Sequence, residues 1–146
     1  MKRIFVSLSF MLAVGLTTAF ADNKTDVSSK IKESFKKEFT EAESVTWDAV
    51  ETYQIARFVF HNHAVIAYFS QDGELLGSAR TILFNELPLT VIKSFEGKFS
   101  EANFTEISEV SNIEGTSYVM TVEIKNKQYH VKVNPNGNIL TSYRIK

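Results

Sequence analysis

The residues best suited to chemistry are two histidines separated by one position, in His61-Asn62-His63. Two imidazoles at this spacing on a strand can share a metal ion if a third ligand, such as Asp72, lies close. The same segment falls between two apolar runs, where His and Asn are ordinary turn residues. The second half of the chain has Asn126-Lys127-Gln128 near the corresponding place, so the fold does not need the histidines. A solvated turn is therefore preferred to a metal site at His61 and His63.

The sequence contains no other familiar catalytic motif. It has no cysteine, no Gly-x-Ser-x-Gly, no phosphate-cradling glycine loop and no His-Glu-x-x-His. Glu41 and Glu101 recur at the ends of two similar segments, where we expect them to be solvated or to cap local backbone. Arg80 and Arg144 also recur, and each could pair with a helix or bind an anion on an open sheet face. An enzyme built on the histidine pair is therefore the least favoured reading.

The elements that would position these residues occur twice along the chain. The segment SFKKEFTEA at 34–42 returns as SFEGKFSEA at 94–102, and DGELLGSAR at 72–80 returns as NGNILTSYR at 136–144. Two anchors in the same order predict a duplicated unit of about 60 residues. We expect a first α-β4 unit at 22–82 and a second at 83–146, packed as one compact body because each alone would bury too little apolar surface.

Each unit begins with a four-residue apolar period and continues with a two-residue alternation. The first pattern predicts amphipathic helices on the stripes Val27, Ile31, Phe35, Phe39 and Leu87, Val91, Phe95, Phe99. Asp26 and Asn85 are the expected caps, with Pro88 in the first turn of the second helix. The alternation predicts about four antiparallel strands in each unit. Asp72-Gly73 and Asn136-Gly137 predict tight hairpin turns.

The first 21 residues are predicted to be a signal peptide. Lys2 and Arg3 precede an apolar stretch at 4–16, and Ala19-Phe20-Ala21 is a cleavage signal. Cleavage after Ala21 would give a periplasmic or secreted protein, and an uncleaved N-terminal anchor is the alternative. Without cysteine the protein has neither a lipoprotein anchor nor disulfides. The net charge of −1, more negative without the basic start, argues against a nucleic-acid partner and allows at most peripheral membrane contact.

Several of these residues together resemble a known family. They are the helix ending in Phe35-x-x-x-Phe39, Trp47 on the first strand, Tyr53 at the start of the next, and the hairpin Phe69-x-x-Asp72-Gly73-x-Leu75-Leu76, all after a signal peptide. The pattern resembles the exported β-lactamase-inhibitor-like or PepSY-like domains frequent in Bacteroidetes. The resemblance implies an α+β fold: two tandem helix-plus-four-stranded antiparallel meander repeats forming one curved sheet with helices packed on one face. Thr40 and Ser100 depart from the family, which often has Pro there, and Ile107 replaces the Trp in the second copy.

A comparison of the two units points to a candidate binding surface. On two adjacent predicted strands, the residues that should face solvent in the first unit are Ile55, Arg57, Val59, Ile66 and Tyr68. The second unit has mostly polar residues at these alternate positions, including His130 and Lys132. An apolar patch with Tyr and Arg on a sheet face is typical of a binding surface. The alternatives are that an N-terminal segment or a second copy of the chain covers it.

The expected function is that of an exported, non-catalytic binding domain without a cofactor. It would present the open face of its sheet to a protein or peptide, as an inhibitor-like scaffold does, and a homodimer through that face is possible. A periplasmic carrier of an apolar or anionic small ligand on the same face is the alternative.

Overall fold

The computed structural model describes residues 26–99 and 101–145, so the predicted signal peptide and its cleavage site lie outside the described residues. The first half contains helix α1 (Ser29–Glu38) and strands β1 (Glu43–Val50), β2 (Tyr53–Phe60), β3 (His63–Ser70) and β4 (Leu75–Thr81). A short 3-10 helix, η1 (Phe84–Glu86), leads into the second half. That half contains α2 (Leu89–Lys98), β5 (Asn103–Asn112), β6 (Gly115–Ile124), β7 (Lys127–Val133) and β8 (Ile139–Arg144).

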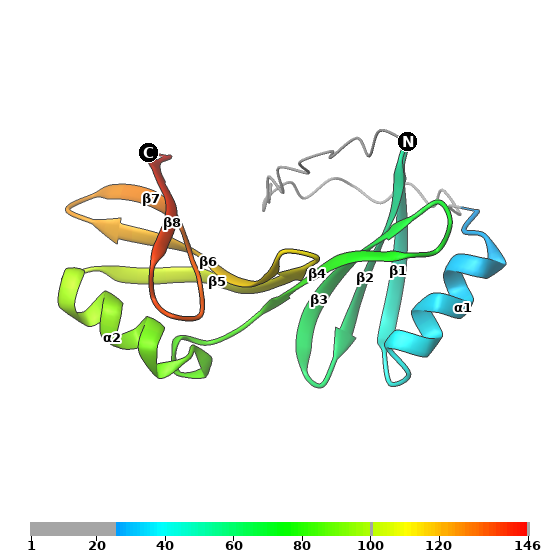
Figure 1. Ribbon diagram of the computed structural model, residues 1–146, viewed down its shortest axis with the longest axis horizontal. Coiled ribbons are helices and arrows are strands. Elements are labelled where there is room, and N and C mark those ends of the chain that lie inside the picture. The colour runs from blue at the N-terminus through cyan, green and yellow to red at the C-terminus, as the bar shows by residue number, and fades with distance from the viewer. Residues whose placement is uncertain (1–25, 100, 146) are drawn as a thin grey trace.

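All eight strands form one antiparallel sheet whose spatial order is the chain order, β1 to β8. The expected α+β class with a single sheet is therefore confirmed, while the duplication itself stays a prediction. Strands β4 and β5 pair from Gly77 opposite Asn112 to Thr81 opposite Ser108, and this ladder joins the halves. Figure 1 shows α1 beside β1–β4 and α2 beside β5–β8, with the strands of the two halves running in different directions across the view.

Both helices pack on the same face of the sheet. Helix α1 buries Ile31 and Phe35 against one cluster of side chains from β2 and β3: Ala56, Phe58, Val65, Ala67 and Phe69. Helix α2 buries Val91 and Phe95 against a second cluster, which includes Met120, Val122, Val131 and Val133. The strand register shows that the two clusters share a face. Ala67 lies opposite Ser78, Ser78 lies opposite Ser111, and Ser111 lies opposite Thr116. Every second residue of β6 after Thr116 points the same way, so Met120 lies on the same face as Ala67. The other side of the sheet, here called the open face, carries no helix of the described residues.

The helix starts differ from the sequence prediction. Ser28, not Asp26, caps α1, because its hydroxyl accepts a hydrogen bond from the Ile31 amide at 3.4 Å. Pro88 is the residue before α2 rather than a member of its first turn, and Asn85 lies in η1. Asn85 does not cap α2 because residues 83–86 close a turn of their own, in which the Glu86 carboxylate accepts a hydrogen bond from the Leu83 amide at 2.6 Å.

The two glycine hairpin turns lie where they were predicted. Gly73 and Gly137 have φ values of 81° and 82°, which favour glycine. The turn at Gly137 also contacts α2, because the Ser94 hydroxyl donates to the Gly137 carbonyl at 2.7 Å. A Cβ on Gly137 would lie 2.7 Å from the Thr90 carbonyl oxygen, so this glycine lets the β7–β8 turn approach the helix backbone.

Candidate functional site

The predicted metal ligands do not converge. His61 and His63 lie at the β2–β3 turn, whereas Asp72 lies at the β3–β4 turn. These turns are at opposite ends of β3, roughly 25 Å apart at the usual rise per strand residue. The idea that Asp72 completes a site with both histidines is therefore wrong, and with it the enzyme built on these three residues. Across residues 26–99 and 101–145, no group of three His, Cys, Asp or Glu side chains could hold a metal ion.

Each histidine instead has a separate local partner. His61 Nε2 lies 3.2 Å from Glu41 Oε2, with both side chains mostly exposed. His63 Nδ1 lies 2.9 Å from the Thr81 carbonyl oxygen, and its Nε2 lies 3.4 Å from Glu86 Oε1. His61 and Asn62 both have positive φ, at 49° and 66°, as a two-residue hairpin turn requires. The interpretation as a solvated turn residue therefore holds for His61, whereas His63 begins β3 and its side chain is 23% exposed.

Arg80 forms an ion pair across the joint between the two halves. Its Nε and Nη2 donate to Glu109 Oε1 and Oε2 at 3.1 and 3.3 Å. The expected alternatives for Arg80, a helix partner or an anion on the open face, are both wrong. Arg80 pairs with Val65 and therefore lies on the helix-bearing face, and its partner is the neighbouring strand β5. Burial raises the pKa of Tyr118, and the negative charge of Glu109 with its hydrogen bond raises the pKa further, against a smaller opposing effect of Arg80.

The five predicted binding residues lie side by side on the open face. Ile55 stands opposite Tyr68, and Arg57 stands opposite Ile66. Val59 continues the same row of β2, where it is 37% exposed. Cross-strand pairs of this kind bring side chains into direct contact, so Ile55, Val59, Ile66 and Tyr68 form a continuous surface that we call the apolar patch. Whether this surface binds anything stays a prediction.

Charge at the edge of the apolar patch is modest. Arg57 Nε lies 3.1 Å from Asp48 Oδ2 on β1, and the two side chains are 50% and 59% exposed. Such an exposed pair contributes about 0–1 kcal/mol and can rearrange when a partner binds. Burial raises the pKa of Tyr68, Arg57 lowers it, and Tyr53 raises it. Tyr68 is therefore uncharged at neutral pH, and its ring lies 5.8 Å from that of Tyr53.

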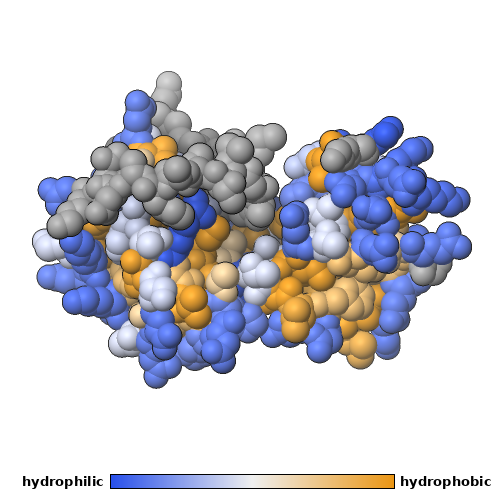
Figure 2. Space-filling view, turned by 180° about the vertical axis from the view of Figure 1, so that it is seen from behind, coloured by the Kyte–Doolittle hydropathy of each residue, from blue (hydrophilic) through white to orange (hydrophobic). Residues whose placement is uncertain are grey.

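A buried apolar cluster adjoins the apolar patch on the side of the second half, and the sequence comparison missed it. Ala79 stands opposite Ile66, Val110 stands opposite Ala79, and Val119 joins them in a cluster on the open face. All three side chains are at most 8% exposed, although no helix of the described residues lies over them. In Figure 2 orange, hydrophobic residues are visible on both halves of the molecule, with paler and blue residues between the two areas.

Comparisons with known proteins establish the fold of this chain and nothing about its activity. No family model matches the chain, and no curated protein matches it. A solved structure described as a BLIP-like protein from Bacteroides fragilis has a TM-score of 0.76 at 19% identity, covering 84% of this chain and 89% of that one. The chain has a BLIP-like fold. A putative periplasmic protein from Bacteroides eggerthii (0.75, 21%, covering 83% and 91%) and a DUF2874 family protein from Bacteroides uniformis (0.74, 18%, covering 80% and 88%) share it.

The hairpin turns of this chain explain why the cluster of Ala79, Val110 and Val119 was missed. Lys125 and Asn126 have φ values of 50° and 62°, so they occupy the place of His61 and Asn62 in the other half. Counting back from these turns aligns Ile55 with Val119, whereas an alignment of the two units by sequence alone places Ile55 against Ser117. The matching pair of positive-φ turns was the signal that could have corrected the alignment. No helix among the described residues is long and apolar enough to cross a membrane.

Proposed function

We propose that this protein is an exported, non-catalytic binding domain that receives a protein or peptide on the open face of its sheet. The proposal depends on one observation, the side-by-side placement of Ile55, Ile66 and Tyr68 on a face that carries no helix of the described residues. Ile55, Ile66 and Tyr68 are half-buried and Val59 is exposed. A contiguous apolar group on one side of a sheet is typical of an interaction surface.

The composition of the apolar patch suits a protein partner. Tyr68 combines a large apolar ring with a hydroxyl, and Arg57 at the edge can exchange its contact with Asp48 for a carboxylate of the partner. Aromatic and arginine side chains carry much of the binding energy in protein interfaces. Beside the patch, the buried cluster of Ala79, Val110 and Val119 continues the apolar character without presenting large side chains.

The alternative of a small-ligand carrier on the same face has less support. One cavity of the protein lies between α1 and β1, and another is lined by Glu41, Ala42, Glu43, Val59, His61 and Asn62. Neither cavity includes Ile55, Ile66 or Tyr68. Val59 of the apolar patch lines the second cavity, so the preference for a macromolecular partner comes from the contiguous row of Ile55, Ile66 and Tyr68 along two strands.

The test compares two lysine substitutions on the same face. Tyr68→Lys places a charge in the apolar patch, whereas Thr141→Lys places the same charge on exposed β8 at the other end of the open face. Partners captured from periplasmic extract by the wild-type protein are purified, and their affinities are measured directly. We expect Tyr68→Lys to weaken one specific partner by about tenfold or more and Thr141→Lys to leave it unchanged.

Circular dichroism and thermal unfolding must first show that both variants fold. Sedimentation velocity identifies a second copy as the occupant if the wild-type protein is a dimer and Tyr68→Lys is a monomer. If Tyr68→Lys keeps every partner at wild-type affinity and the same oligomeric state, the open face is not the binding surface.

A further inference from the structure

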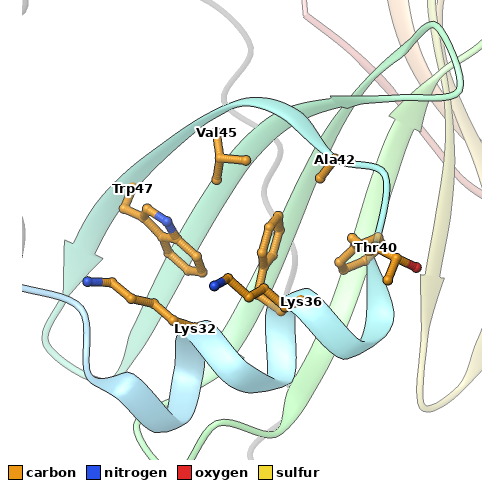
Figure 3. Close-up of a pocket in the computed structure, with 8 residues that line it drawn as sticks. Lys32, Lys36, Thr40, Ala42, Val45 and Trp47 are labelled. Carbon is orange, nitrogen blue, oxygen red and sulfur yellow. The ribbon is translucent and has the colours of Figure 1, made fainter.

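A groove lies between α1 and the edge strand β1, on the face of the sheet opposite the apolar patch. Its volume is about 470 Å³. Its apolar lining consists of Phe35, Phe39, Ala42, Val45 and Trp47. Its polar lining consists of Lys32 and Lys36 on the helix and Thr40 just after it. Figure 3 shows Lys32 and Lys36 on α1 facing Trp47 and Val45 across the groove.

The charged part of the groove is entirely basic. Lys32 and Lys36 are one helical turn apart, and none of the described residues that line the groove is acidic. Neither lysine forms a salt bridge with a carboxylate of residues 26–99 or 101–145. Like charges at this spacing destabilise a helix by a few tenths of a kcal/mol, and only Lys36 is near enough to the helix end to gain from its dipole. An anion in the groove would relieve this repulsion.

The other half of the molecule shows that the fold does not require such a groove. At the positions of Lys32 and Lys36, helix α2 has Ile92 and Glu96, which remove one positive charge and reverse the other. Beside that helix, Phe104 packs its ring 5.3 Å from Phe95. The first half has the smaller Val45 near the corresponding place, and the groove lies there beside Phe35.

We propose that the groove between α1 and β1 binds a fatty-acid-like carboxylate. Its apolar chain would lie on the rings of Phe35 and Trp47, and its carboxylate would be held by Lys32 and Lys36. The volume is within the range of small-ligand pockets, and the lining combines an apolar majority with a few polar groups at one side. Lysine–carboxylate contacts supply charge-assisted hydrogen bonds and select against neutral molecules of the same shape. This site does not depend on the function proposed for the open face.

Trp47 makes the proposal directly testable because it is the only tryptophan in the sequence and it lines the groove. The probe is decanoate below its micellar concentration, and decan-1-ol is the neutral control. We expect decanoate to change Trp47 emission saturably and to bind about tenfold or more tightly than decan-1-ol. The double variant Lys32→Gln/Lys36→Gln should lose this preference. The matched variant Lys37→Gln/Lys98→Gln removes the same charge outside the groove and should keep it.

A second substitution tests the apolar part of the site. Val45→Phe introduces the kind of ring that Phe104 provides in the other half, and it should abolish binding of both probes while the circular dichroism spectrum is unchanged. Tyr68→Lys on the open face should leave decanoate binding intact, which separates this site from the apolar patch. The proposal is overturned if decanoate causes no saturable change, if decan-1-ol binds equally well, or if Lys32→Gln/Lys36→Gln binds decanoate as the wild type does.

Discussion

Replacing Phe95 by alanine should destabilise both halves of the molecule, although Phe95 lies only in the second. Its ring is 1% exposed, and it lies 5.4 Å from that of Phe99 and 5.3 Å from that of Phe104. Truncation of such a buried ring costs about 3–5 kcal/mol, a large part of the total stability of a small domain. The experiment asks whether this loss of unfolding free energy affects only the second half or lowers the stability of both halves together.

The first half contains a built-in reporter of this coupling. Trp47, the only tryptophan, packs edge-on against Phe35 at 5.2 Å in the core beneath α1. The β4–β5 ladder and the Arg80–Glu109 pair connect that core to the second half, and each half alone has too small a core to be stable. We therefore expect Trp47 fluorescence and far-ultraviolet circular dichroism to report one transition in urea. With a loss of about 3 kcal/mol and a slope of about 1.5 kcal/mol per molar, both midpoints move by about 2 M.

Two other substitutions complete the experiment. Phe35→Ala should lower both midpoints in the same way, because it removes the corresponding ring beneath α1. Leu89→Ala, at a side chain that is 63% exposed, should change them little. The reasoning is refuted if Phe95→Ala shifts the circular dichroism transition while Trp47 fluorescence keeps the wild-type midpoint, because the halves would then unfold independently.

Further predictions concern two glycines and one buried tyrosine. Gly137→Ala should lower the free energy of unfolding in urea by about 1 kcal/mol or more, because its φ is 82° and the added Cβ meets the Thr90 carbonyl. Gly97→Ala, in α2 with open space around it, should instead raise it by about 0.5–1 kcal/mol. The pKa of Tyr118 is raised in the folded state, so its contribution to stability is complete below the unfolded value near 10 and is lost as pH rises further. Chemical unfolding between pH 9 and pH 11.5 should show a steeper loss for wild type than for Tyr118→Phe, and equal slopes would contradict the assignment.

Much of the fold could be predicted because its periodicities are simple. The Phe35 and Phe95 stripes, the alternating strands and the two glycine turns depend on local sequence, and the structure places them as expected. The helix starts could not be predicted as well, because Asp26 and Asn85 are good caps by type but the chain near Asn85 forms η1 instead. Side-chain type alone does not decide between two adjacent turns.

The candidate sites were predicted less completely, for reasons of geometry. Side chains alternate between the two faces of a strand, so the sequence could predict that Ile55, Ile66 and Tyr68 lie on the same face of the sheet. The separation of His63 from Asp72 along β3 requires knowledge of which turns share an end of the sheet. The α1–β1 groove was missed because lysines on the polar side of a helix are usually solvated, and only comparison with Ile92 and Glu96 marks them as distinctive.

The chain order of the sheet has a consequence for how the protein folds. Every strand pairs with its neighbour in sequence, and only the β4–β5 ladder, from Gly77 to Asn112, must close a long segment. The contact order is therefore low for a protein with so much sheet, and such topologies fold faster than sheets with distant pairings. A chain that emerges N-terminus first can assemble β1–β4 as consecutive hairpins before β8 is available. The slow step would then be the docking of the second half along β4, after which Arg80 and Glu109 meet.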